Sequence, residues 1–272
     1  MLTFVPTPIG NIGDISFRTL EVLKDTELIL CEDTRVAKKL LHLLGSKYEQ
    51  EFPNFDFISL HSHNEKKFLE DSSNIELLKS KNSIYMSDAG MACISDPGAL
   101  LVEYCLKNKI EFDVLPGANA ILTAFASSGF NTTEFTFFGF LPHKGNDRKA
   151  KLDRVIINQN LSILYESPHR LQKLLKELAE LIPHRTIFLT KELTKKFQTR
   201  YKGKSIEIYE TLKNEEIKGE WVVVIENEDK GTGGVITKED IMALDLAPKQ
   251  KAKLISKLTG ENVKDIYNSL IS

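Results

Sequence analysis

Acidic residues and glycines gather in one short stretch of the chain, residues 87–98. It reads Ser87-Asp88-Ala89-Gly90 after an apolar run and Ser95-Asp96-Pro97-Gly98 before an amphipathic segment. Such sequences form good turns and helix caps. A carboxylate beside a glycine can also accept a hydrogen bond from a ligand that approaches the backbone closely. For any one such turn taken alone, a purely structural role is favoured over a binding role.

Polar and glycine-rich segments also follow four other apolar runs that are typical of strands. They are residues 6–14, 32–35, 61–65 and 115–118. In an open parallel sheet, ligands bind in the crevice outside the carboxyl ends of the strands. Because five such segments coincide, the sequence favours a ligand site at that edge.

Several kinds of site do not match these residues. Gly10 and Gly13 lack the first tight G-x-G of a dinucleotide fingerprint, and the chain has no P-loop, so neither a nicotinamide enzyme nor an NTPase is predicted. His61 and His63 share one face of a strand, but no third ligand is evident, so no metal is expected. The three cysteines, at 31, 93 and 105, have no metal spacing and indicate a reducing cytoplasm.

The elements that must position these residues alternate between strand and helix in the first part of the chain. The apolar periodicity predicts strands at residues 2–5, 28–31, 57–60, 84–86 and 112–115. It predicts helices at residues 16–24, 34–44, 65–79 and 99–107, with Gly45 ending the second of these as a left-handed C-cap. This alternation predicts an α/β fold with a mainly parallel sheet.

A second set of elements follows Pro116-Gly117. Helices are predicted at residues 119–128, 148–158 and 168–181, strands at 135–140, 162–165, 186–189 and 221–225, and a hairpin containing 206–209. The best linker is 230–234, and two or three short helices follow it. The predicted organisation is an N-terminal α/β domain at 1–117, a C-terminal α/β domain at 118–230, and a small helical tail at 235–272.

The net charge of the chain is −2, so binding to a polyanion requires local patches. Cations cluster in residues 144–154, 191–204 and 249–257, although for each patch taken alone a solvated surface is favoured over RNA binding. The N-terminus has no secretory pattern, and no apolar run is long enough to span a membrane.

Seven blocks of sequence together resemble the ribosomal RNA small subunit methyltransferase I family, which belongs to the tetrapyrrole-methylase-like methyltransferases. In chain order they are PTPIGNIGDISFRTLEVL, CEDTRVAKKLL, SDAGMACISDPGALLV, LPGANAILTAFASSGF, GFLPHKGNDR, YESPHRL and KELTK. The resemblance extends from Pro6 to the helical tail. It implies two α/β domains with the cofactor in the cleft between them, and a homodimer.

The activity that the resemblance implies is 2′-O-methylation of a cytidine ribose in the decoding region of small-subunit (16S) ribosomal RNA. The implied cofactor is S-adenosyl-L-methionine, and the implied partner is the small ribosomal subunit in the cytoplasm. Two alternatives stay open: a methyltransferase for a tetrapyrrole or another small molecule, and a non-catalytic RNA- or ribosome-binding module. The second is favoured only by Met91-Ala92, where the family usually has Thr-Pro.

S-adenosylmethionine needs acceptors for its ammonium and ribose diol, backbone N–H groups for its carboxylate, and an apolar slot for its adenine. The residues expected to bind it are Pro8, Asp88, Ala89, Gly90, Ile94, Ser95, Asp96, Pro116, Gly117, Ala118, Phe138, Glu166, Ser167 and Leu193.

A ribose hydroxyl is a poor nucleophile, so a base or an orienting group should assist it. The candidates, in falling order, are Asp33, Glu32, Asp14 and His63. Arg35 either contacts a neighbouring phosphate or pairs with Glu32. The full set of expected RNA-binding residues is Arg35, Lys144, Arg148, Lys149, Lys195, Lys249 and Lys253.

Overall fold

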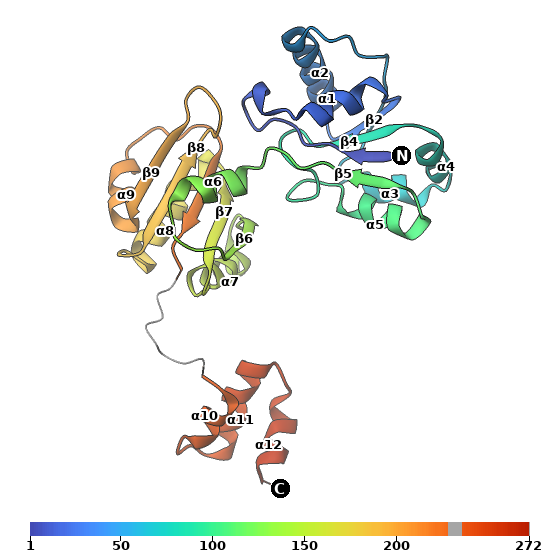
Figure 1. The fold of residues 1–272 in the computed structure, drawn as a ribbon. Coiled ribbons are helices and arrows are strands. Elements are labelled where there is room, and N and C mark those ends of the chain that lie inside the picture. Colours follow the sequence, from blue (N-terminus) through green and yellow to red (C-terminus); the bar gives the residue numbers. More distant parts are fainter. Residues whose placement is uncertain (228–235, 272) are drawn as a thin grey trace. The chain divides into compact units, whose positions relative to one another are not determined.

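The computed structural model describes residues 1–227 and 236–271 (Figure 1). The chain divides into two compact units, Met1–Glu228 and Asp229–Ser272. The predicted linker at residues 230–234 lies outside the described residues. The first unit contains two five-stranded sheets, and the second contains helices.

The first sheet is entirely parallel, as the sequence predicts. It consists of β1 (Leu2–Phe4), β2 (Leu28–Cys31), β3 (Asp56–Ser59), β4 (Ser83–Met86) and β5 (Phe112–Val114), in the order β3-β2-β4-β1-β5. β1 and β4 are therefore neighbours, and their carboxyl ends lie at the same edge.

Helices cover both faces of this sheet because successive side chains of each strand point to opposite sides. Ile29 and Cys31 pack with α1 (Phe17–Lys24) and α2 (Thr34–Tyr48). Leu28 and Leu30 pack on the other face, which is covered by α3 (Glu65–Glu70), α4 (Ser73–Ser80) and α5 (Ala99–Asn108). The chain thus leaves β1 toward one face and β4 toward the other, which opens a crevice between their ends.

The second sheet is mixed. It consists of β6 (Phe135–Phe140), β7 (Leu161–Glu166), β8 (Thr186–Lys191), β9 (Thr199–Lys204) and β10 (Trp221–Ile225), in the order β6-β7-β10-β8-β9. Only β6 and β7 run parallel, and the other neighbouring pairs are antiparallel. β9 is the last strand in this order and is therefore an edge strand.

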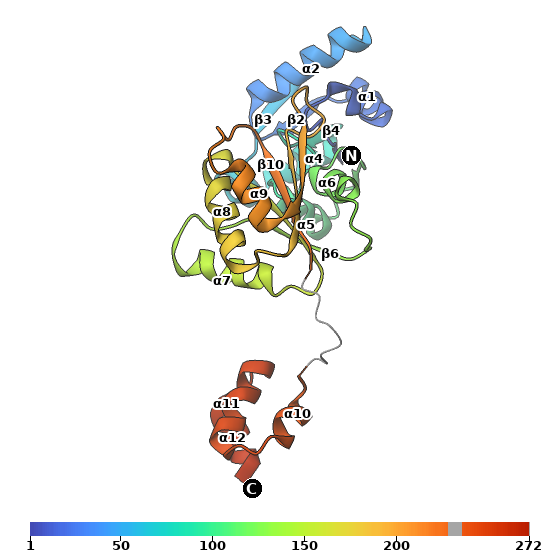
Figure 2. The ribbon, with the colours of Figure 1, turned by 90° about the vertical axis from the view of Figure 1, so that its left-hand side faces the viewer.

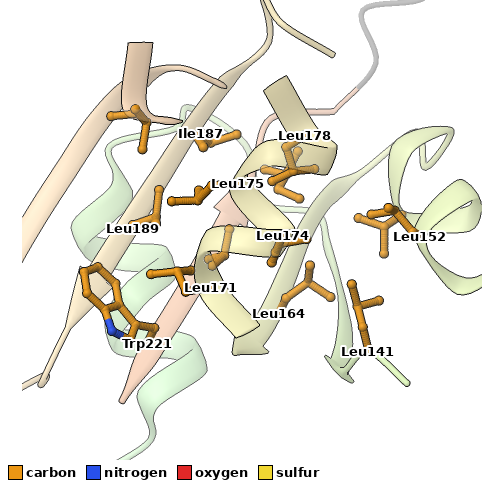
Figure 3. Close-up of a cluster of buried hydrophobic side chains, with 14 of the residues drawn as sticks. Leu141, Leu152, Leu164, Leu171, Leu174, Leu175, Leu178, Ile187, Leu189 and Trp221 are labelled. Carbon is orange, nitrogen blue, oxygen red and sulfur yellow. The ribbon is translucent and has the colours of Figure 1, made fainter. Parts of the chain in front are cut away.

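One face of the second sheet carries α7 (Gly145–Ile156), α8 (Pro168–Leu181) and α9 (Ser205–Leu212), and the other carries α6 (Ala120–Ser128). Figure 2 shows α8 and α9 on the opposite side of the sheet from α6. Figure 3 shows the leucines of α8, at positions 171, 174, 175 and 178, over Ile187, Leu189 and Trp221. This spacing of three and four residues is that of a helix face, so the whole stripe is buried.

Three predicted elements are wrong in detail. The second helix does not stop at Gly45. It continues to Tyr48, and Glu49 caps it with φ 50°. The predicted helix 65–79 is two helices, because Asp71 accepts bonds from the backbone N–H and hydroxyl of Ser73 and starts a new turn there.

The third error is the hairpin at residues 206–209. These residues belong to α9, because Ser205, Ile208 and Leu212 are buried at helical spacing. The hairpin is formed instead by β8 and β9.

The second unit has three helices in the described tail, which confirms the prediction of two or three. They are α10 (Lys238–Ala243), α11 (Pro248–Thr259) and α12 (Val263–Ile271), packed around Ile241, Ala252, Ile255 and Ile266. Across residues 1–227 and 236–271, no helix has both the length and the apolar character needed to cross a bilayer.

Candidate cofactor site

The loops that follow β1 and β4 are joined to each other by hydrogen bonds. The Thr7 N–H donates to the Gly90 carbonyl at 2.9 Å, and the Gly90 N–H donates to the Thr7 carbonyl at 3.0 Å. The Thr7 hydroxyl also donates to the carbonyl of Ser87 at 3.2 Å. Gly90 has φ 86°, and a Cβ there would lie 3.2 Å from Ile9, so glycine suits both its conformation and its close packing.

A pocket of about 340 Å³ lies beside this junction, within the usual size range of small-molecule sites. Its wall from the first sheet's loops consists of Ile9, Ala89, Gly90, Met91, Ile94, Ser95 and Asp96. Its opposite wall consists of Asn119, Ala120, Phe140, Tyr165, Glu166, Ser167, Pro168, Leu193, Glu220, Trp221 and Val222. The pocket is therefore formed by the strand-end loops of both sheets.

Aromatic residues line the second wall. The rings of Phe140 and Tyr165 are 5.5 Å apart between centroids and tilted by 57°. Burial raises the pKa of Tyr165 to about 12, so its hydroxyl stays protonated at neutral pH. Tyr165 lies opposite Val222 in the β7–β10 pairing, which brings two of the lining residues side by side. This wall offers flat apolar surface of the kind that a purine ring requires.

The titratable carboxyl groups that line the pocket are acidic, although two of them are paired with cations outside the lining: Glu166 with Arg170 at 2.9 Å and Glu220 with Lys195 at 2.8 Å. Asp96, Glu166 and Glu220 line the pocket, and no lysine or arginine does so among the residues that the structure describes. Burial raises the pKa of Asp96, while its hydrogen bond with Ser87 opposes that rise. A ligand that carries positive charge therefore suits this pocket better than an anionic one.

Glu32, at the end of β2, lies next to the loop after β4. Its Oε1 is 3.4 Å from the backbone nitrogen of Asp88, which donates to it. Burial, and secondly the negative charge of Asp96, raise the pKa of Glu32 to about 7. The pKa of Asp88 is also raised, chiefly by burial. Glu32 can thus exchange a proton near neutral pH.

Asp33 occupies a different environment from its neighbour. Its carboxylate accepts the Arg35 backbone N–H at 2.8 Å as the N-cap of α2, and it forms an ion pair with the Arg35 guanidinium at 2.6 Å. These hydrogen bonds lower the pKa of Asp33 to about 2. Arg35 therefore pairs with Asp33, and not with Glu32 as the sequence suggested. Asp14 and His63 are both exposed.

The predicted cofactor residues fall into two groups. Those that line the pocket are Ala89, Gly90, Ile94, Ser95, Asp96, Glu166, Ser167 and Leu193. Six others are not among its lining residues: Pro8, Asp88, Pro116, Gly117, Ala118 and Phe138. Three of these six, Pro8, Asp88 and Ala118, are sequence neighbours of residues that line it. Gly117 lies against the Pro6 ring.

Phe138 was predicted to bind the cofactor, but it does not line the pocket. It packs against the buried cluster under α7 and α8, because a bulge between Phe137 and Gly139 shifts the register of β6. Phe140 takes its place in the pocket. The alternation of an aromatic-rich strand gives no sign of such a bulge, so the sequence could not distinguish these phenylalanines. Tyr165, Trp221 and Val222 were missed because they look like ordinary core residues.

Arg148 was predicted to bind RNA, but its side chain is buried and therefore not available to RNA. It is 3% exposed, and its guanidinium donates to Glu177 at 2.6 Å and to the Pro142 carbonyl at 3.1 Å. Lys144, Lys149, Lys249 and Lys253 are exposed. Lys195 forms ion pairs with Glu192 and Glu220. No cluster of three or more metal-binding side chains occurs in the described parts of the chain.

Comparisons with known proteins agree with this geometry. The family model for Tetrapyrrole (Corrin/Porphyrin) Methylases matches residues 1–209. A protein of Campylobacter fetus subsp. fetus named ribosomal RNA small subunit methyltransferase I is 48% identical over the full length of both chains. A Helicobacter pylori (strain ATCC 700392 / 26695) protein of the same name is 44% identical, covering 98% of this chain and 96% of the relative.

Solved structures show the same fold at low identity. Diphthine synthase superposes with a TM-score of 0.62 at 13% identity, covering 83% of this chain and 89% of its own. Uroporphyrin-III C-methyl transferase from Thermus thermophilus, complexed with S-adenyl homocysteine, superposes with a TM-score of 0.56 at 14% identity, covering 84% and 97%.

As a member of the methylase family, the chain uses S-adenosylmethionine as its cofactor. The pocket fits it: the acidic lining suits the sulfonium and ammonium, and the Phe140–Tyr165 wall suits the adenine. With a family model over most of the chain and full-length relatives above 40% identity, the chain belongs to the ribosomal RNA small subunit methyltransferase I family, within the tetrapyrrole methylases.

Proposed function

We propose that the chain transfers a methyl group from S-adenosylmethionine to the 2′-oxygen of a cytidine ribose in the decoding region of 16S ribosomal RNA. Membership of the family supports ribosomal RNA as the substrate. The observation that carries the proposal is the acidic pocket at the strand ends, with a carboxyl group of near-neutral pKa beside it. The reaction then takes place in the cytoplasm on the small subunit, and the working form is a homodimer.

The loop after β4 has the main part in binding the methyl donor. Asp96 and Ser95 line the pocket and can accept hydrogen bonds from the ammonium or the ribose diol. The Thr7–Gly90 hydrogen bonds fix this loop against the end of β1, so its groups are in place before the ligand arrives. Bound S-adenosylmethionine supplies the methyl group, and most of the rate enhancement comes from holding the oxygen in line with it.

Glu32 is the best candidate for receiving the proton of the ribose hydroxyl. A general base works best when its pKa lies near the operating pH, and the pKa of Glu32 is about 7. Asp33, the first candidate from sequence, is held by Arg35 and by the start of α2, with a pKa of about 2. A carboxylate so strongly stabilised is a weak base, so Asp33 positions α2 and Arg35.

The proposal is tested on small ribosomal subunits that lack the modification. The purified chain and labelled S-adenosylmethionine should place one methyl group per subunit, and nuclease digestion followed by mass spectrometry should locate it on a cytidine ribose. Methylation of a base, or of another RNA, would contradict the proposal. A parallel assay with corrinoid precursors should give no methyl transfer, and transfer there would favour a small-molecule substrate.

A further inference from the structure

An aromatic ring stands in solvent on the loop between β8 and β9. Phe197 is 71% exposed, although Leu193 on the same loop is 6% exposed and Trp221 nearby in the pocket wall is 3% exposed. Exposing a phenylalanine to this degree forfeits the stabilisation that its burial would give. A binding role explains why the ring is exposed if the residues around it suit a particular ligand.

The loop that presents Phe197 is rigidly built. The Thr194 N–H donates to the side chain of Gln198 at 2.8 Å, and the Gln198 N–H donates to the Lys195 carbonyl at 3.1 Å. Glu192 and Thr194 both have left-handed backbone conformations, with φ 52° and 64°. Non-glycine residues hold such conformations only where neighbouring contacts enforce them, so the ring projects from a preformed support.

This loop also adjoins the cofactor pocket and the first sheet's loops. Leu193 lines the pocket, and the Asn11 N–H donates to the Thr194 hydroxyl at 2.9 Å. Gly10 is so close to the loop that a Cβ would lie 2.4 Å from the Cγ of Lys195. Phe197 therefore lies on the same short loop as Leu193, which lines the pocket where we propose that the methyl group is transferred.

The surroundings of the ring are cationic. The Nζ of Lys196 lies 5.5 Å from the ring centroid. Along the edge strand β9, Arg200, Lys202 and Lys204 occupy alternate positions and hence one face, and Lys202 lies over the Phe130 ring at 4.5 Å. Within the described residues, neither Lys196 nor Arg200 forms an ion pair with an acid.

We propose that Phe197, with Lys196 and Arg200, is a stacking site for an unpaired base of the RNA substrate beside the cofactor pocket. The inference rests on the proposed function. A ring that accepts a base face, flanked by cations that neutralise phosphates, is the recurrent arrangement for single-stranded nucleic acid. A target ribose can reach a methyl donor only where its strand is accessible, so its neighbouring bases are free to stack.

Two substitutions at Phe197 test the site, with methylation of unmodified small subunits as the assay. Phe197→Ala should raise the KM for subunits about tenfold or more, the loss expected for one stacked base, with the calorimetric Kd for S-adenosylmethionine unchanged.

Phe197→Trp should keep the wild-type KM. Its fluorescence should be quenched by a ten-nucleotide single-stranded RNA, since the native Trp221 is buried. Arg200→Ala should reduce the salt dependence of RNA binding by about one phosphate contact.

Matched controls lie on α8. Leu181 is 54% exposed and the side chain of Lys176 is 61% exposed, so Leu181→Ala and Lys176→Ala should leave the KM unchanged. Unaltered KM for Phe197→Ala, together with no quenching of Phe197→Trp, would overturn the inference. So would a shift from dimer to monomer in Phe197→Ala with unchanged RNA affinity, because the ring would then join two copies of the chain. If the wild-type chain methylated no subunit RNA, the proposed function would fail, and quenching by RNA would still decide this site.

Discussion

Two adjacent carboxyl groups, Glu32 and Asp33, have opposite properties in this fold. Glu32 is partly buried beside Asp88 and near the charge of Asp96, and its pKa is raised to about 7. Asp33 accepts bonds from Arg35 and caps α2, and its pKa is lowered to about 2. One position along the chain thus separates a group that can take up a proton at neutral pH from one that cannot.

We expect Glu32→Gln to lower kcat by about a hundredfold, the usual contribution of a general base. The wild-type kcat should rise with pH through about 7, as Glu32 loses its proton, and this rise should be absent in the variant. Single-turnover kinetics between pH 5 and 9 measures both. Asp33→Asn is the control: asparagine is also a good N-cap, so the pH profile should keep its shape. A profile that stays intact in Glu32→Gln would exclude the role.

Stability should change in the opposite direction to activity. The folded-state pKa of Glu32 lies above its ordinary value, so the folded protein loses stability as pH rises from about 4.5 through 7 and Glu32 ionises. Glu32→Gln removes that cost, and since the group is partly solvated we expect a gain of about 1–2 kcal/mol at pH 8. Urea denaturation at pH 4 and pH 8 measures it, and equal effects at both values would contradict the cause given.

The residue types alone could not show which of the two carboxyl groups, Glu32 or Asp33, is the better general base. The segment Glu32-Asp33-Thr34-Arg35 predicts a polar strand end and a helix cap, and both are found. Which carboxylate is desolvated depends on the loop after β4, whose Asp88 N–H reaches Glu32 from 56 residues away. A contact so distant in sequence leaves no local pattern, and Asp33 therefore ranked first.

At the scale of elements, the parallel sheet was predictable and the mixed sheet less so. Continuous apolar runs between helices identify buried parallel strands, so the β1 and β4 loops were found from sequence. The second wall of the pocket depends on β10 pairing with β7, which places Val222 beside Tyr165. Antiparallel neighbours separated by more than 50 residues cannot be paired from periodicity, so that wall was found only in part.

The buried ion cluster of the second sheet gives a prediction about α7. Arg148 pairs with Glu177 and lies 3.9 Å from Glu166, whose side chain is fully buried. Arg148→Met leaves these carboxylates with less compensation, so we expect a loss of about 2–4 kcal/mol in the free energy of unfolding. Lys149→Ala, on the exposed side of the same helix, should change it by less than about 0.5 kcal/mol. Equal effects would show that Arg148 is not buried as described.

The loop after β4 gives a second prediction at this scale. Gly90→Ala places a Cβ 3.2 Å from Ile9 in a left-handed conformation that costs about 1–2 kcal/mol. The loop should shift, and the Kd for S-adenosylmethionine should rise about tenfold by calorimetry. Gly260→Ala has similar backbone strain, with φ 78°, but nothing within 4 Å of its Cβ and no part in the pocket. Cofactor affinity should be unchanged there, and a matching loss would point to general destabilisation.

At the scale of the whole molecule, the chain is two compact units whose cores share no residue. The buried clusters of the first unit contain no residue beyond Ile225, and the tail packs on its own cluster. Every lining residue of the pocket lies in the first unit, so we expect the fold and the cofactor pocket to form without the tail.

A chain that ends at Glu228 should bind S-adenosylmethionine with unchanged Kd, because every pocket residue lies in the first unit. Its binding to small subunits should be weaker and less sensitive to salt. Lys249 and Lys253 are exposed on α11, which has no acidic residue, so each can neutralise a phosphate. The slope of log K against log salt should then fall by about 0.7–0.9 per lysine, or between one and two in total.

Filter binding between 50 and 200 mM salt measures this slope. The double variant Lys249→Ala/Lys253→Ala in the full chain is the control, because it removes the two charges without removing the whole unit. If the double variant and the shortened chain both kept the wild-type slope while the shortened chain lost solubility, the tail would serve stability alone.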